Sequence, residues 1–157
     1  METRTTPAGR RAKKPKTQQH RARVLALQVL YEVDVSGHPW RTSLATHAEA
    51  TESSDHVIEM ATAVVEGVLA SMSHIDELIS INAPMWPVDQ LSLVDRNVLR
   101  LAIFELLPGS DIPPKVAINE AVELAKEFGG AASSRFVNGV LGATLEGLDS
   151  TSETSTD

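Results

Sequence analysis

The segment from Val98 to Leu107 constrains the fold more than any other part of this sequence. It contains only two charged residues, Arg100 and Glu105, and Pro108-Gly109 follows it directly. Most helices of globular proteins are apolar along one stripe, whereas a helix that is apolar nearly all round is buried. We therefore predict that residues 92–107 form the central helix of the protein and that other helices pack around it.

The rest of the chain between its two polar ends also has the apolar spacing of helices. We find no run of alternating apolar and polar residues, and no pair of segments with the pattern of a strand hairpin. The predicted helices cover about residues 19–35, 41–50, 55–72, 74–83, 92–107, 115–128 and 133–148. These segments predict an all-α fold, a compact bundle of six or seven helices.

Two prolines divide the predicted bundle into two packed halves. Pro84 and Pro87 interrupt the helical pattern, which places the halves at about residues 19–83 and 88–148. We expect Trp86, which lies between these prolines, to fill a gap in the core.

Local signals predict further details of the helices. In the first helix, four apolar residues at spacings of three and four form the stripe expected to be buried: Val24, Leu27, Tyr31 and Val35. Ser54 or Asp55 is the expected N-cap of the third helix, and Ser73 that of the fourth. We expect the last helix to continue through Asn138-Gly139, because its apolar period is unbroken there.

Basic residues are concentrated at the start of the chain. Residues 1–23 contain eight of the fourteen Lys and Arg residues and one acidic residue, so this segment has a net charge of +7. Residues 24–157 have a net charge of −14. We predict a disordered basic arm over residues 1–18, a helical domain over residues 19–148 and a disordered acidic tail over residues 149–157. Both end segments have almost nothing apolar to bury.

A block of positive charge favours a nucleic acid as the partner. The candidate contacts lie in the arm and where the first helix begins: Arg10, Arg11, Lys13, Lys14, Lys16, Arg21 and Arg23. Arginine binds phosphate through paired hydrogen bonds, and the free N–H groups of a helix start favour anions. Since no helix-turn-helix pattern is present, a basic segment that orders on binding favours RNA over duplex DNA. The alternative is a tail that attracts polyanions without specificity.

The sequence contains no pattern that indicates a catalytic, metal or cofactor site. It has no cysteine, no glycine-rich phosphate loop and no Gly-x-Ser-x-Gly motif, and its five histidines lack the spacing of a zinc-protease helix. We therefore expect no catalytic residue, no metal and no cofactor. No apolar run approaches the ~20 residues that cross a bilayer, and no secretory signal follows the basic start. We expect a cytoplasmic protein that does not enter a membrane.

Three segments, in the same order along the chain, carry a resemblance to a known family. They are DRNVLRLAIFELL (residues 95–107), DIPPKVAINEAVELAK (residues 111–126) and RFVNGVL (residues 135–141), and the first helix from Arg21 to Tyr31 matches as well. Over about residues 19–148 the chain resembles the transcription antitermination factor NusB. The resemblance implies an all-helical RNA-binding protein that is not an enzyme.

The resemblance also implies partners and site residues. NusB proteins pair with the ribosomal protein NusE, and the pair binds the single-stranded boxA element of nascent ribosomal RNA and helps RNA polymerase to ignore terminators. The family's arginine-rich helix start falls on Arg21 and Arg23, and its Arg–Phe pair in the last helix falls on Arg135 and Phe136. The candidate partner-binding residues are Tyr31, Asp95, Arg96 and Arg100. The alternatives are core packing for Phe136 and ion pairing within the protein for the charged residues of the partner set.

Two positions depart from the family pattern. The arginines expected just before Arg21 are replaced by Gln19-His20, so phosphate contacts would shift to residues 10–16 or weaken. The acidic residue often found shortly before the last helix is replaced by Gly130-Ala131-Ala132. Two other functions stay open at this point. One is a protein-interaction module with a non-specific basic arm, and the other is a stand-alone relative of the N-terminal domain of RsmB-type rRNA methyltransferases.

Overall fold

The computed structural model describes residues 16–154 of the protein, with the backbone alone for residues 152–154. These residues form seven α-helices and one short 3-10 helix, and none of them is in a strand. The elements are α1 (Gln18–Ser36), α2 (Trp40–Ala50), α3 (Asp55–Ala70), α4 (Met72–Asn82), η1 (Val88–Gln90), α5 (Leu93–Leu106), α6 (Pro114–Phe128) and α7 (Ser133–Thr154). The prediction of a compact all-α bundle is confirmed. Arg10, Arg11, Lys13 and Lys14 lie outside the described residues.

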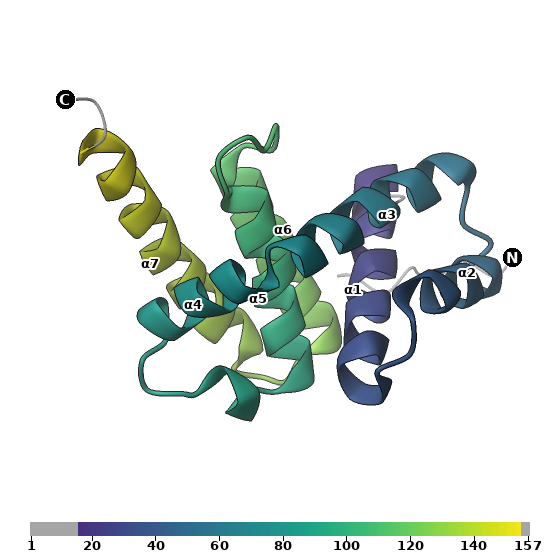
Figure 1. Ribbon diagram of the computed structural model, residues 1–157, viewed down its shortest axis with the longest axis horizontal. Coiled ribbons are helices and arrows are strands. Elements are labelled where there is room, and N and C mark those ends of the chain that lie inside the picture. Colours follow the sequence, from purple (N-terminus) through teal and green to yellow (C-terminus); the bar gives the residue numbers. More distant parts are fainter. Residues whose placement is uncertain (1–15, 155–157) are drawn as a thin grey trace, which may run out of the picture.

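Helix α5 lies at the centre of the bundle, as its composition predicted. It packs against α1, α3, α4, α6 and α7, and Figure 1 shows α4 and α7 on one side of it and α1 and α2 on the other. Val98, Leu99, Ala102 and Ile103 are fully buried. Each Å² of apolar surface that α5 buries stabilises the fold by roughly 25 cal/mol. Helix α5 is therefore the helix around which the others pack.

The boundary between the two groups of helices lies earlier than the sequence suggested. We predicted it at Pro84 and Pro87, but α4 packs against α5 and α7. The chain leaves the first group at Ser71, where α3 and α4 meet at an angle of 73°. Ile75 and Ile79 of α4 are fully buried, so these two side chains fix α4 in the second group.

The buried face of α1 differs from the predicted stripe. Leu27 is buried, but the side chains of Tyr31 and Val35 are 41% and 58% exposed. The face turned to the core consists of Ala22, Leu25, Ala26, Val29 and Leu30. Both faces of this helix are apolar at helical spacing, so periodicity could not decide which one is buried. The helix therefore presents a second, exposed apolar face.

The ends of the helices confirm some of the predicted signals and correct others. The hydroxyl oxygens of Ser54 and Ser92 accept hydrogen bonds from the N–H groups of Val57 and Asp95, as expected of N-caps. The predicted cap at Ser73 is wrong, because α4 begins at Met72. Trp86 does not fill the core; its side chain is 57% exposed.

Helix α7 is longer than predicted. It continues through Asn138-Gly139, as we expected, but it ends at Thr154, so residues 149–154 are helical instead of disordered. No proline follows Leu148 in this stretch. The hydroxyl groups of Ser150 and Thr151 donate to the backbone carbonyls of Glu146 and Gly147, one turn earlier. These side chains bond to the helix itself, so the lack of apolar residues did not end it.

No single helix among residues 16–154 has both the length and the apolar composition to span a bilayer. Helices α3 and α4 would meet these criteria only as a pair, and they are bent by 73° at their junction.

The turn between α6 and α7 offers a first prediction about stability. A Cβ atom added at Gly129 would lie 2.7 Å from the backbone oxygen of Ala125 and 2.6 Å from Cβ of Ser133. Nothing lies within 4 Å of a Cβ added at the neighbouring Gly130. We expect Gly129→Ala to lower the free energy of unfolding by about 1–3 kcal/mol, the usual cost of overpacking. Gly130→Ala should change it by less than about 0.5 kcal/mol. Urea denaturation measures both, and equal effects would contradict the packing argument.

Candidate functional site

At the start of α1, one cation has no ion pair within residues 16–154. Thr17 caps the helix through its side-chain oxygen, which accepts from the N–H group of His20. Arg21 follows on an exposed position and makes no ion pair with any residue between 16 and 154. Lys16, just before the helix, is held instead by Glu127 of α6, with 3.1 Å between Nζ and Oε1. Of these two cations, Arg21 is the one available to an external phosphate.

His20 occupies a position between two carboxylates of α6. Its Nδ1 lies 3.4 Å from Oε2 of Glu120, and its Nε2 lies 3.4 Å from Oε2 of Glu127. The imidazole is only 13% exposed. The residue that replaces an arginine of the family pattern therefore links α1 to α6 instead of pointing freely into solvent.

Arg23 is buried, which removes it from the surface where we expected it. Its Nε donates to Oε1 of Glu105 at 2.9 Å, and its Nη2 donates to Oε2 of the same carboxylate at 3.1 Å. Arg23 is 7% exposed and Glu105 is 3% exposed. Burial raises the pKa of Glu105 above its ordinary value, although Arg23 opposes that rise. The pair joins α1 to α5, so the structure gives Arg23 an internal role.

The two residues expected at the start of α7 lie in different environments. Arg135 is exposed and makes no ion pair within residues 16–154, whereas Phe136 is half-buried and packs against the core. The hydroxyl group of Ser133 accepts from the N–H group of Gly130 at 3.0 Å, which fixes the turn in front of them. Arg135 is thus a second free cation on the described surface.

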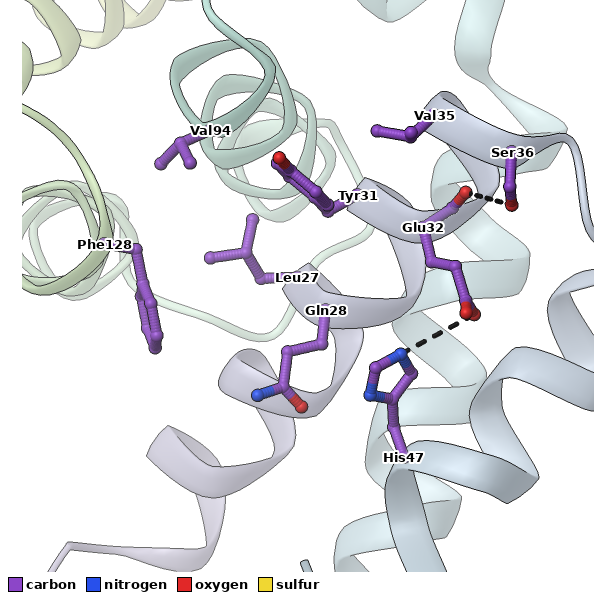
Figure 2. A pocket seen from close by; sticks show the side chains of 9 residues that line it. All are labelled: Leu27, Gln28, Tyr31, Glu32, Val35, Ser36, His47, Val94 and Phe128. Atoms are coloured by element: carbon purple, nitrogen blue, oxygen red, sulfur yellow. Dashed lines mark hydrogen bonds and ion pairs between the residues drawn. The ribbon is translucent and has the colours of Figure 1, made fainter. Parts of the chain in front are cut away.

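The exposed apolar face of α1 forms one wall of a groove. Figure 2 shows that Leu27, Tyr31 and Val35 project from α1 towards the groove, with Val94 of α5 and Phe128 of α6 on its other side. The cavity has a volume of about 490 Å³. Most of its lining surface is apolar, and nine residues contribute to it: Leu27, Gln28, Tyr31, Glu32, Val35, Ser36, His47, Val94 and Phe128. Tyr31, Val35 and Phe128 are large side chains that the fold leaves exposed.

Two polar side chains that line this groove, Gln28 and Glu32, carry buried oxygen atoms without a hydrogen-bond partner among residues 16–154. The side-chain oxygen Oε1 of Gln28 is buried and accepts no hydrogen bond from any residue in the described part of the chain. Oε2 of Glu32 lies 3.6 Å from Nε2 of His47, too far for a hydrogen bond. Oδ1 of Asp95, next to Val94 in sequence, is also buried without a partner. Among residues 16–154, these oxygen atoms lack the hydrogen-bond partner that buried polar atoms usually have.

The charged residues predicted for partner binding form an internal network. Arg96 donates from Nε to Oδ2 of Asp34 at 2.9 Å, and Arg100 donates from Nη1 to the same oxygen at 3.2 Å. Arg100 also makes two 2.9 Å hydrogen bonds to the carboxylate of Asp76. Thus Arg96 and Arg100 join α5 to α1 and α4, whereas Asp95 makes no ion pair with any residue in the described part of the chain.

Sequence reasoning did not identify several residues of this region. Asp34, Glu105 and Glu127 pair with residues more than 60 positions away along the chain, and spacing carries no signal for such pairs. Of these three, only Glu105 had a usable signal, since it is one of two charged residues in the otherwise apolar segment 98–107 and therefore needs a buried partner.

The described residues thus form an all-α protein whose first helix carries an exposed arginine at its start and an open apolar groove along its second half. The profile of the NusB family matches residues 20–146. The chain belongs to the NusB family.

Relatives and solved structures agree with this assignment. The transcription antitermination protein NusB of Dehalococcoides mccartyi is 44% identical over 137 residues, which are 87% of this chain and 96% of that protein. NusB of Chloroflexus aggregans is 46% identical over 131 residues, 82% of this chain and 87% of that protein. The structure of T. maritima NusB superposes with a TM-score of 0.76 at 36% identity, covering 84% of this chain and 93% of that one.

One similar structure contains partners. It is described as antitermination factors NusB and NusE in complex with dsRNA, and it superposes with a TM-score of 0.76 at 27% identity, covering 83% of this chain and 97% of that chain.

Proposed function

We propose that this protein is a transcription antitermination factor that binds single-stranded, boxA-type RNA of nascent ribosomal RNA together with NusE. In this role it would join the antitermination complex of RNA polymerase. The observation that carries the proposal is that α1 combines a free cation at its start, Arg21, with an unfilled apolar groove at Tyr31. A protein of the same fold has been found with NusE and RNA, which supports two binding surfaces.

The RNA surface that we propose consists of the basic arm, Arg21 and Arg135. The arm adds Arg10, Arg11, Lys13 and Lys14, and Lys16 joins them at its junction with α1. Arginine holds phosphate oxygens through paired hydrogen bonds. Phe136 is partly exposed, so part of its side chain is available for stacking with a base. Arg23 is not part of this surface, because its guanidinium is already bound to Glu105.

The NusE surface that we propose is the groove between α1, α5 and α6. Exposed aromatic side chains at the centre of a concave apolar surface are typical of the residues that dominate binding energy. Tyr31 and Phe128 meet this description, and we also propose Asp95 as a contact, because its Oδ1 atom has no hydrogen-bond partner in the described part of the chain. A protein surface that presents an apolar side chain to Tyr31 and Phe128 and an N–H donor to Asp95 would match both features.

Separate variants of the two surfaces test the proposal. We expect Arg21→Ala to weaken binding of boxA RNA by about 3–10-fold and to flatten the salt dependence by about 0.7, the value for one lost phosphate contact on a single strand. Tyr31→Ala should weaken NusE binding by at least about 10-fold and leave binding of RNA alone unchanged. Fluorescence anisotropy with labelled RNA, with and without NusE, measures both effects.

The controls use a scrambled RNA, and each variant is also measured in the binding assay of the other surface. With NusE present, the wild-type protein should prefer boxA RNA to the scrambled sequence. Equal affinity for both RNAs would contradict the boxA assignment. Capture of a protein partner that survives nuclease treatment, without any RNA preference, would instead indicate a protein-interaction module.

A further inference from the structure

We propose that Glu127 is an intramolecular competitor of the RNA and is therefore a residue that sets RNA affinity in this protein. The inference rests on the proposed function, because it assumes that phosphates approach the start of α1. Two of the groups there that can carry positive charge, Lys16 and His20, are bound to one carboxylate. Arg21 and Arg135 are bound to none within residues 16–154.

Glu127 uses both of its oxygens for this purpose. Oε1 lies 3.1 Å from Nζ of Lys16, and Oε2 lies 3.4 Å from Nε2 of His20. Lys16 Nζ is itself 3.4 Å from the same imidazole nitrogen. The carboxylate thus occupies the position beside Lys16 and His20 that a phosphate group would take, with the same charge sign and the same kind of acceptor atom.

Two kinds of ion pair on α1 differ in how readily they can exchange. The Arg23–Glu105 pair is buried, so breaking it would leave a charge without a partner in the interior. Lys16 and Glu127 are 48% and 37% exposed. Exposed ion pairs contribute little, because water solvates both partners after they separate. A phosphate can therefore displace Glu127 from Lys16, whereas it cannot displace Glu105 from Arg23.

The exchange has a lasting cost for the complex. After Lys16 turns to a phosphate, the Glu127 carboxylate stays on α6 beside the bound strand, where like charges repel. Glu120 remains with His20 through the other ring nitrogen, at 3.4 Å. Removing the charge of Glu127 therefore both frees Lys16 and abolishes the repulsion.

The test compares Glu127→Gln with Glu123→Gln. Glu123 is on the same helix, is 62% exposed and pairs only with Lys126 among the described residues. Both variants change the net charge by the same amount, so long-range attraction of RNA rises equally. We expect Glu127→Gln to bind boxA-type RNA about 5-fold more tightly than wild type, with a salt dependence steeper by up to about 0.7. Glu123→Gln should differ from wild type by less than about 2-fold.

A double-mutant cycle assigns the effect to Lys16. In a Lys16→Ala background, the gain from Glu127→Gln should fall to the level of the Glu123→Gln control, because the cation that it frees is missing. Circular dichroism and thermal unfolding confirm that each variant keeps the native fold.

The outcomes separate this inference from the proposed function. If wild type does not bind RNA at all, both are overturned. If wild type binds boxA RNA and the two Gln variants gain equally, or the gain from Glu127→Gln persists without Lys16, the proposed function stands and the role of Glu127 is overturned.

Discussion

Replacing Arg23 by Met should lower the free energy of unfolding by about 3–5 kcal/mol near neutral pH, the usual cost of removing one partner of a buried ion pair. The substitution keeps most of the apolar volume of the side chain. It leaves the Glu105 carboxylate, which is 3% exposed, without the two hydrogen bonds of 2.9 and 3.1 Å that it now accepts. Glu120, whose charge also raises the pKa of Glu105, would remain nearby.

The size of this loss should depend on pH. Burial already holds the pKa of Glu105 above its ordinary value in the folded protein, and removing Arg23 would raise it further. A carboxyl whose pKa is higher in the folded state binds more protons there, so stability falls as pH rises through the folded value. We therefore expect the deficit of Arg23→Met relative to wild type to be largest at pH 7–8 and to shrink towards about pH 4–5. Urea denaturation across this range measures it.

Arg21→Met is the matched control for this prediction. It removes the same functional group two residues earlier on the same helix, from an exposed position. We expect it to change the free energy of unfolding by less than about 0.5 kcal/mol while weakening RNA binding. A variant Arg23→Met that is fully stable and loses RNA affinity would show that Arg23 faces the RNA after all.

The fold was largely predictable because composition alone identifies the central helix. A segment with two charges in ten positions has no polar face to expose, so α5 must be surrounded. The face of α1 was not predictable in the same way. Ala22, Leu25 and Val29 recur at helical spacing, as Leu27, Tyr31 and Val35 do, and the choice between the two faces depends on which neighbours are present. The face of α1 with Leu27, Tyr31 and Val35, which is not turned to the core, lines the groove.

The candidate site was predictable in position and less so in detail. The sequence located the basic start of α1, but it could not distinguish Arg21 from Arg23. That distinction depends on Glu105, which pairs with Arg23 and lies 82 residues after it in the sequence. For the same reason, the sequence could not show that Lys16 is held by Glu127. Long-range ion pairs depend on the angle between helices, which local patterns do not specify.

The second large effect that we expect is at Asp34, in the last turns of α1. Its Oδ2 atom accepts from Nε of Arg96 at 2.9 Å and from Nη1 of Arg100 at 3.2 Å. It also accepts from Nδ2 of Asn97 at 3.0 Å. Asp34→Ala removes all three acceptor contacts and should lower the free energy of unfolding by about 2–4 kcal/mol, since hydrogen bonds to charged groups contribute about 1.5–3 kcal/mol each and some partners retain other bonds.

Arg96 and Arg100 keep other hydrogen bonds in Asp34→Ala, so the loss of stability should be smaller than for an arginine left without any partner. Arg96 still donates to the carbonyl oxygen of Val88, and Arg100 keeps both hydrogen bonds to Asp76. Asp34→Asn should therefore lose less than Asp34→Ala, because its amide oxygen can still accept. Asp89→Ala, which removes an exposed carboxylate without an ion pair among residues 16–154, should have almost no effect.

Asp34→Ala should also weaken NusE binding, because the same network holds the end of α1 against α5. Tyr31 and Val35, one on each side of Asp34 along the helix, line one wall of the groove, and Val94 of α5 lies across from them. If the end of α1 is free to move, the groove loses its fixed shape, and part of the binding energy is spent on ordering it again. Calorimetric titration with NusE at a temperature where the variant is still folded should show a Kd raised by about 5–10-fold. An unchanged Kd in a clearly destabilised variant would separate the network from the groove and leave Asp34 a purely structural residue.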